Sequence, residues 1–561
     1  MSDSEQDPQA AQPTAGESAP VIATVADPSP ALKAEKKTRL TPPTWVWCVV
    51  GLWCILLVAV RVANAFDDHA IVNILTLVFG FLAVSALVSW FAFLSGYSRI
   101  LRLGGLAVLI GSLSLFTTFF RIYQVSGELV PSYRLRHAKS PDELLEALPA
   151  MTGENVSVKE TTPDDYPEFL GPRRLARVDT IRLDPDWTAR RPREIWRRSI
   201  GAGWSGFAVV NGVAVTMEQR GNLELVTCYR VADGELVWSY AVEGRHETFM
   251  GGIGPRSTPT INDGRVYSQG AFGTVLCLDG ASGVKIWSDE LLGRYGIPRS
   301  DDLKAISWGR SASPLVVDDL VIVPAGGPVD GPHVSLIAFD KTSGRLVWES
   351  GDRQVSYSSP VLATLGGKRQ ILIVNEDNAS GHDPKSGRLL WQVDWPGKSN
   401  AKASVSQAVP VPPNRFLLSK AYGGGAALFQ LNPGRSGEFK VQNIWRNKKV
   451  LKTKFCNVVV HNDHVYGLSD GILQCVELAT GRRVWRGGRY GHGQLLGVRD
   501  HLIVQLEFGK MAVVDATPEG FREVSRFSPL DGKTWNNPTL YGNLLLVRNS
   551  EEAACFELAI D

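Results

Sequence analysis

The side chains that could do chemistry are spread thinly along this chain. Its nine histidines and seven cysteines are scattered, without an HExxH zinc motif, a CxxC pair or a phosphate-binding GxxxxGK[ST] loop. The stretch Asn375-Glu376-Asp377-Asn378 is rich in oxygen ligands, but it lacks the alternation and the terminal glutamate of a calcium loop. We interpret it as a polar hairpin turn. These motifs therefore identify neither a catalytic residue nor a metal ligand.

A second set of residues suits binding better than catalysis. Charged and aromatic side chains in loops can form a contact surface when a rigid scaffold holds them. We predict such a ligand or partner surface at Arg220, Arg256, Trp308, Arg310, Tyr357, Glu376 and Asn378. For each of them alone an ordinary surface role is the better interpretation, so the prediction concerns the set. We interpret the lysines within residues 448–454 as a solvated loop.

Three apolar segments indicate a membrane anchor. Residues 1–43 are poor in aromatic side chains and predict a disordered cytoplasmic tail. The runs Trp45–Phe66, Ala70–Ser98 and Leu103–Phe120 can each cross a hydrocarbon core of about 30 Å as a helix, which gives three transmembrane helices within residues 44–122. The tail ends in a basic cluster and the next loop is acidic, so the positive-inside rule places the N-terminus in the cytoplasm and the C-terminal part outside.

The composition of the remaining chain favours a β protein. The net charge of +2 excludes a dedicated nucleic-acid binder, which needs a clustered basic face. The 55 glycines and 16 tryptophans are typical of a β structure that is rich in turns and in aromatic side chains. Residues 123–190 form a predicted linker with one short helix over residues 142–148.

Residues 191–561 are repetitive. Five segments have the form of a strand, a tight glycine turn and a second strand whose tryptophan lies four residues after the glycine, as in Gly344 and Trp348. The aromatic residues of the repeat, including two degenerate copies and one that opens the domain, are Trp196, Trp238, Trp287, Trp348, Trp391, Trp445, Trp485 and Phe527. They lie about 40 to 60 residues apart, which suits one four-stranded blade for each.

The two ends of the repeat region predict a closed ring. The segment Cys555–Leu558 matches the start of Cys475–Leu478 and stops before its glycine and tryptophan, and a strand around Glu194–Trp196 can replace the missing one. We therefore predict an all-β, eight-bladed β-propeller with four-stranded antiparallel blades behind the three-helix anchor. The cysteines Cys228, Cys277, Cys475 and Cys555 share one repeat position, so we expect small buried core residues rather than disulfide partners.

These repeats resemble the PQQ repeat of quinoprotein-type propellers, whose motif is A-x-D-x-x-T-G-x-x-x-W. The segment Tyr166–Pro172 is similar to the W-P-Q-F-R-G-P opening of bacterial PQQ-binding-like propellers, especially those common in planctomycetes. The BamB propeller lipoproteins of outer-membrane assembly are more distantly similar. The resemblance covers residues 165–561 and implies the fold more strongly than an activity, because one propeller architecture hosts unrelated functions.

Two functions are compatible with this resemblance. The one we favour is a non-catalytic binding or scaffold module, anchored in the bacterial inner membrane with the propeller in the periplasm, which contacts envelope proteins and needs no cofactor. The alternative is a membrane quinoprotein dehydrogenase that uses PQQ and calcium to oxidise an alcohol or a sugar. Family alcohol dehydrogenases carry adjacent cysteines over the cofactor, which this chain lacks, whereas its anchor is similar to that of membrane glucose dehydrogenases. The partner, the ligand and the oligomeric state are not assigned by the sequence.

Overall fold

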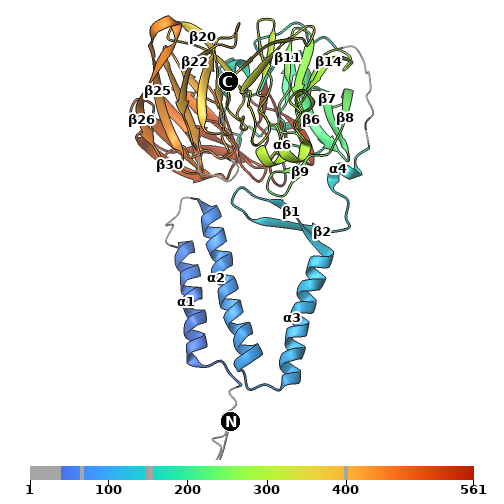
Figure 1. Ribbon diagram of the computed structural model, residues 1–561, viewed down its shortest axis with the longest axis vertical. Helices are drawn as coiled ribbons and strands as arrows, with labels where there is room; N and C mark the ends of the chain where they lie inside the picture. The colour runs from blue at the N-terminus through green and yellow to red at the C-terminus, as the bar shows by residue number, and fades with distance from the viewer. Residues whose placement is uncertain (1–39, 63–67, 147, 149–155, 397–401) are drawn as a thin grey trace, which may run out of the picture.

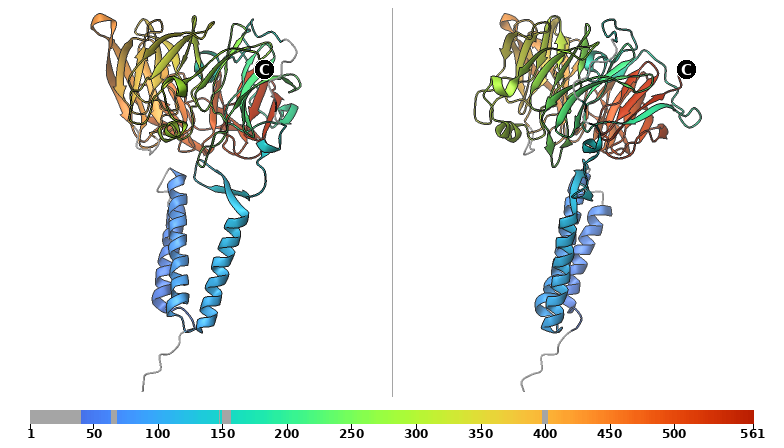
Figure 2. Two further views of the ribbon diagram at one scale, coloured as in Figure 1. Left: turned by 45° about the vertical axis from the view of Figure 1, so that its right-hand side comes forward. Right: turned by 90° about the vertical axis from the view of Figure 1, so that its right-hand side faces the viewer.

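Three long apolar helices lie below a ring of β-sheets in the computed structural model (Figure 1). It describes residues 40–62, 68–146, 148, 156–396 and 402–561, so the predicted tail lies outside the described residues as far as residue 39. The helices are α1 (Thr44–Val62), α2 (His69–Ser89, extended by the π-helix Trp90–Leu94) and α3 (Arg99–Phe119), and each is long and apolar enough to cross a membrane. α1 and α2 lie side by side, whereas α3 diverges from them toward the propeller (Figures 1 and 2).

Eight four-stranded antiparallel blades form the ring, which confirms the predicted architecture. The first four blades are β5–β8 (Ala208–Val210, Val213–Arg220, Leu223–Arg230, Leu236–Glu243), β11–β14 (Thr260–Asn262, Arg265–Gln269, Thr274–Asp279, Lys285–Glu290), β15–β18 (Leu315–Val317, Leu320–Val323, Leu336–Asp340, Leu346–Ser350) and β19–β22 (Val361–Leu365, Lys368–Val374, Asn378–His382, Leu389–Asp394). The other four are β23–β26 (Val409–Val411, Arg415–Lys420, Gly425–Pro433, Phe439–Asn447), β27–β30 (Val459–His461, His464–Ser469, Ile472–Glu477, Arg483–Arg489), β31–β34 (Gln494–Val498, His501–Gln505, Met511–Asp515, Glu523–Phe527) and β35–β37 (Thr539–Tyr541, Leu544–Arg548, Glu552–Glu557) with β4 (Arg193–Ser199).

The ring closes through the two distant ends of the repeat region. β37 pairs antiparallel with β4, and Cys555 lies opposite Trp196 in that ladder. The last blade therefore takes three strands from the C-terminus and its outermost strand from the start of the domain, as predicted. This pairing leaves no open edge between the first and last blades.

The repeated glycine and tryptophan join neighbouring blades. Gly344 has a φ of +71°, and an added Cβ would lie 2.6 Å from the indole of Trp287 in the preceding blade. The Trp287 indole nitrogen donates a 3.1 Å hydrogen bond to the Lys341 carbonyl in the same turn. Equivalent indole-to-carbonyl bonds are made by Trp196, Trp238, Trp348, Trp445 and Trp485. The predicted core cysteines are all buried and free.

The segment between the helices and the ring contains a hairpin and one helical turn. β1 (Phe120–Val125) follows α3 directly and pairs with β2 (Pro131–Leu135), so the hairpin lies between the membrane helices and the propeller (Figure 1). The predicted helix over 142–148 is the shorter α4 (Pro141–Leu144), which a Ser140–Glu143 capping box begins. The remaining short elements are η2 (Pro172–Arg174), β3 (Arg177–Val178), β9 (Glu247–Thr248), β10 (Gly252–Ile253), α5 (Leu291–Arg294), α6 (Arg299–Ala305) and η3 (Arg435–Gly437).

Residues 166–176 cross the ring from the inner strand of the first blade, where Tyr166 pairs with Val209, to that of the seventh, where Gly497 donates to the Ala176 carbonyl, and we call them the plug. The side chain of Arg174 is 1% exposed and forms an ion pair with Glu168 of the same segment. Its guanidinium donates to acceptors on three successive blades, namely Thr260 Oγ1 and the carbonyls of Ser313, Pro314 and Pro360. Four non-glycine residues of the plug, Leu170, Arg173, Arg174 and Ala176, have positive φ angles. Such backbone strain persists only where the surroundings impose it.

Candidate functional site

A cavity of about 570 Å³ lies where the channel meets the membrane anchor. The propeller loops and the plug provide most of its wall, and Phe169 of the plug contributes to it. The other wall comes from the start of α2, including Ile71 and Ile74, and from the tip of the β1–β2 hairpin, residues 126–129. We call these α2 and hairpin residues the lid, because they lie between the propeller wall of the cavity and the membrane.

Aromatic side chains form the propeller wall. The rings of Trp535 and Trp204 lie 5.0 Å apart, and those of Trp535 and Phe455 lie 4.7 Å apart. Trp308 continues this wall, since its ring lies 5.0 Å from Tyr357 and 6.4 Å from Phe455. Trp204, Trp308, Phe455 and Trp535 all precede the innermost strand of a blade, in the first, third, sixth and eighth blades, so the loops before the inner strands meet around the axis of the ring.

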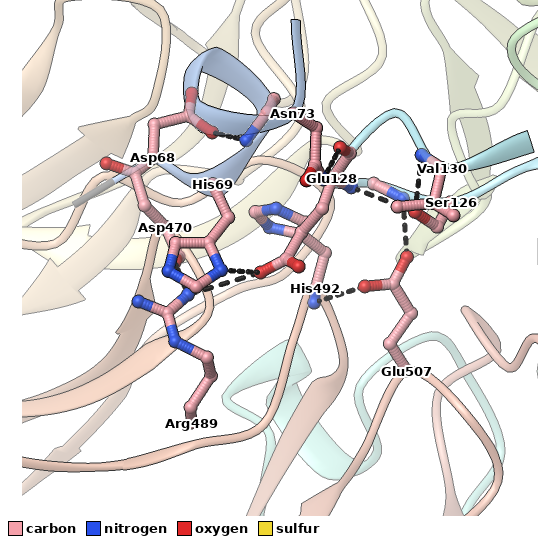
Figure 3. Close-up of polar contacts among 12 residues, drawn as sticks. Asp68, His69, Asn73, Ser126, Glu128, Val130, Asp470, Arg489, His492 and Glu507 are labelled. Atoms are coloured by element: carbon pink, nitrogen blue, oxygen red, sulfur yellow. Dashed lines mark hydrogen bonds and ion pairs between the residues drawn. The ribbon is translucent and has the colours of Figure 1, made fainter. Parts of the chain in front are cut away.

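Charged groups hold the lid on the propeller (Figure 3). Glu507 is 1% exposed and accepts hydrogen bonds from the backbone nitrogens of Gly127 (2.5 Å) and His492 (3.0 Å) and from Nε1 of Trp535 (3.1 Å). Lys454 forms a 3.0 Å ion pair with Asp68, which also caps the start of α2. Burial opposes ionisation of Asp68, but the charge and the hydrogen bond of Lys454, together with the hydrogen bond from the Ala70 backbone, outweigh it and lower the pKa of the carboxyl group.

Glu128 makes a second set of lid contacts (Figure 3). Its carboxylate lies 3.2 Å from Arg489 of the propeller and 3.7 Å from Nδ1 of His69 in α2. Its carbonyl accepts a 2.7 Å hydrogen bond from Asn73 of α2. One residue of the hairpin thus contacts both a membrane helix and a blade.

Two cations at or beside this site face aromatic rings and carbonyl groups: Arg256, which is partly buried and lines the cavity, and Lys533, which is buried and is not among the lining residues. Lys533 Nζ lies 3.9 Å from the ring centroid of Trp535 and 4.8 Å from that of Trp204, and it donates to the Val125 carbonyl. Burial lowers the pKa of Lys533 to about 7. Arg256 donates to the carbonyls of Gly251 and Gly254, and burial lowers its pKa to about 10. Within the described part of the chain, neither cation forms an ion pair with a carboxylate.

Three of the seven residues predicted for a binding surface line the cavity, namely Arg256, Trp308 and Tyr357. Burial raises the pKa of Tyr357 to about 12, and its hydroxyl accepts a hydrogen bond from the backbone nitrogen of Trp308. The structure brings these three together because they lie in loops that precede inner strands.

The other four predicted residues lie outside the cavity wall. Arg220 pairs with Glu218 on β6 and donates to the carbonyl of Glu146 in the linker. The remaining three have partners of their own: Arg310 pairs with Asp302 of α6, Glu376 pairs with Lys402, and Asn378 is buried on β21 beside Asn375. Local partners satisfy these side chains, so they are not presented together to a ligand.

The sequence analysis missed several residues of this site. Lys454, interpreted there as part of a solvated loop, is in fact 6% exposed, because the lid covers it and Asp68 neutralises it. Trp204, Phe455 and Trp535 were not singled out, although their common place before an inner strand could have identified them. The lid could not be identified in this way, since it lies outside the repeats.

The described cavity residues do not fit a calcium ion. Calcium takes about six to eight oxygen ligands, with carboxylates prominent among them. Asp68 is the one carboxylate among the described lining residues, and Lys454 already pairs with it. In the described ranges there is also no cluster of three or more His, Cys, Asp or Glu side chains that could hold a metal.

Comparison with known proteins identifies the repeat. A family profile described as outer membrane protein assembly factor BamB matches residues 186–307 and 224–487. The quinoprotein alcohol dehydrogenase PedH of Pseudomonas putida is 24% identical over 191 residues, which cover 33% of this chain and 29% of PedH. BamB of Moranella endobia is 23% identical over 276 residues, which cover 41% of this chain and 66% of that protein.

The solved structures show the same fold. The quinohemoprotein alcohol dehydrogenase of Comamonas testosteroni superposes with a TM-score of 0.52 at 12% identity, over 71% of this chain and 81% of that one. The matched region spans less than a third of the length of PedH. The predicted resemblance to PQQ-repeat propellers is therefore confirmed at the level of repeat and fold.

Proposed function

We propose that this chain, which belongs to the family of the outer membrane protein assembly factor BamB, is a membrane-anchored binding module and not a dehydrogenase. Its place is the inner membrane of a bacterium, with the N-terminus in the cytoplasm and the propeller in the periplasm, where it contacts envelope proteins. The contact between Asp68 and Lys454 supports this topology, because the α1–α2 loop and the propeller must then share one side of the membrane, as three spans require.

The observation that carries this proposal is the lining of the cavity, whose one described carboxylate, Asp68, is already paired with Lys454. The plug crosses the ring through the bonds of Arg174, and the lid covers the cavity through Glu507 and Lys454. The described lining residues therefore supply no set of carboxylates for the calcium ion that the dehydrogenase would hold with PQQ. PQQ and calcium remain the cofactors of the alternative function.

A cofactor titration separates the two functions. The full chain in nanodiscs is titrated with PQQ in the presence of calcium, and both absorbance and dye-linked oxidation of alcohols and sugars are followed. We expect no saturable binding at micromolar PQQ and no turnover. Saturable binding accompanied by turnover would establish the dehydrogenase and refute our proposal.

Crosslinking in cells tests the binding function directly. Large exposed apolar side chains mark candidate contact surfaces, and Phe249 and Phe508 are 63% and 59% exposed on propeller loops. A photoreactive residue in place of either one should trap a discrete envelope protein on irradiation. If neither position nor any other exposed loop position gives a product, the scaffold function is wrong.

A reporter fused after Asp561 tests the topology. We expect activity from a reporter that works only in the periplasm and none from one that works only in the cytoplasm. The reverse result would place the propeller on the cytoplasmic side.

A further inference from the structure

The cavity beneath the propeller continues into the membrane anchor. Ile71 and Ile74 line it from the first two turns of α2, a candidate membrane span, and they are 42% and 46% exposed. Leu129 at the hairpin tip lines it as well. The apolar part of the cavity therefore lies at the level where the hydrocarbon of a bilayer would meet the propeller.

The opposite wall combines aromatic rings with positive charge. Lys533, which is 7% exposed, lies over Trp204 and Trp535, while Arg256 and Trp204 both donate to the Gly251 carbonyl. Arg256 lines the cavity itself, whereas Lys533 is not among the lining residues. Among the residues that the structure describes, no carboxylate lies within ion-pair distance of either cation, and Glu224 acts on Arg256 and Glu507 on Lys533 only from a greater distance.

This arrangement is costly without an anion. A buried charge is unfavourable unless a counter-charge or sufficient hydrogen bonds compensate it. Two carbonyl groups and the more distant Glu224 compensate Arg256 only in part, whereas Lys454 of the same cavity already has Asp68 as its partner. An incoming anion would supply the missing partner.

We propose that this cavity binds one anionic amphiphile from the adjoining membrane leaflet. Its acidic head lies at Arg256, and its hydrocarbon chain lies along the aromatic wall toward Ile71 and Ile74. The volume of about 570 Å³ is within the range of about 300–1,000 Å³ that is usual for small-molecule sites. This inference does not depend on the protein partner proposed above, since it rests on the lining of the cavity alone.

Quenching of tryptophan fluorescence tests the site, because Trp204, Trp308 and Trp535 form its wall. The full chain in phosphatidylcholine nanodiscs is titrated with dibromostearate, whose bromine atoms quench nearby indoles. We expect a saturable component in addition to the linear quenching that follows from partition into the bilayer. Linear quenching alone would overturn the proposal.

Variants and a matched probe test the role of charge. The substitution Arg256→Gln should weaken the saturable component at least tenfold, whereas Arg369→Gln, which removes an exposed cation paired with Asp318 on a blade edge, should leave it unchanged. A brominated alkyltrimethylammonium of equal chain length needs no variant and should bind at least tenfold more weakly than dibromostearate. Equal binding of the two probes would overturn the proposal even if the Arg256→Gln variant failed to fold.

Two further arms identify the head group. Brominated phosphatidylglycerol placed in the nanodisc tests a phospholipid source, and added dibromostearate tests a free fatty acid; saturable quenching by either one supports the site. Millimolar inorganic phosphate should not displace the bound probe. Complete displacement by phosphate would show that the site recognises an anion alone, and this would refute the amphiphile.

Discussion

Replacing Glu507 with glutamine should release the lid from the propeller while the ring stays intact. The Glu507 carboxylate accepts three hydrogen bonds, from Gly127 in the lid, from His492 and from Trp535, and all three partners are donors. A glutamine keeps one accepting oxygen and turns an amide NH₂ group toward a donor. The substitution thus removes the charge and also creates a buried mismatch.

The size of the effect follows from these contacts. A hydrogen bond to a charged group contributes about 1.5–3 kcal/mol, and a buried unsatisfied donor costs about 1–3 kcal/mol. Because glutamine retains part of the bonding, we expect the free energy of lid opening to fall by about 3 kcal/mol. That corresponds to roughly a hundredfold increase in the open population, since about 1.4 kcal/mol changes an equilibrium constant tenfold.

Hydrogen–deuterium exchange of the full chain in nanodiscs measures this opening. Peptides that cover residues 123–131 should exchange about a hundredfold faster in the Glu507→Gln variant, while peptides from β15–β18 should not change. The control is Glu235→Gln, because Glu235 is 73% exposed in a surface ion pair and should have little effect. Less than a threefold change at the hairpin in Glu507→Gln would refute this account of the lid.

The blades, the plug and the buried histidines give three more predictions. Gly344→Ala should lower the free energy of unfolding by about 2 kcal/mol, since the residue has a positive φ and its new methyl group would meet Trp287; a chemical denaturation midpoint within error of the wild type would contradict this. Arg174→Met should destabilise the ring by about 3–5 kcal/mol, because carbonyl groups of neighbouring blades lose their donor, and an unchanged melting temperature would show that the plug is dispensable. Burial lowers the pKa of His246 and of His492 to about 3, below the unfolded value of 6.5, so the stability they contribute is complete above pH 6.5 and is lost as the pH falls toward 3. At pH 5 the two histidines together should cost up to about 4 kcal/mol, and a melting temperature that is equal at pH 7.5 and pH 5 would refute this.

The fold could be predicted because its determinants are local and repeated. A glycine turn and a tryptophan four residues later specify one hairpin, and the glycine is needed twice, for its positive φ and for the indole of the neighbouring blade, as Gly344 shows. Closure was predictable for a related reason, since the incomplete repeat at Cys555 requires a strand from elsewhere.

The site was only partly predictable because its parts are far apart in the sequence. Asp68 and Lys454, which pair across the cavity, are separated by 386 positions, and no repeat connects them. Loop residues of the same type also differ in whether a neighbouring side chain forms an ion pair with them. Arg310 is neutralised by Asp302, whereas Arg256 has no such partner among the described residues, and their sequences do not reveal this difference.

The pairing of β4 with β37 has a consequence for biosynthesis. Arg193 and Glu557, which form an ion pair in this ladder, are separated by 364 positions. The outermost strand of the last blade, β4, therefore stays unpaired until β37 has been synthesised. Contacts of such high sequence separation form slowly. A chain that lacks β37 therefore leaves both β4 and β36 with an unpaired edge, which makes the propeller a substrate for proteases and prone to aggregation.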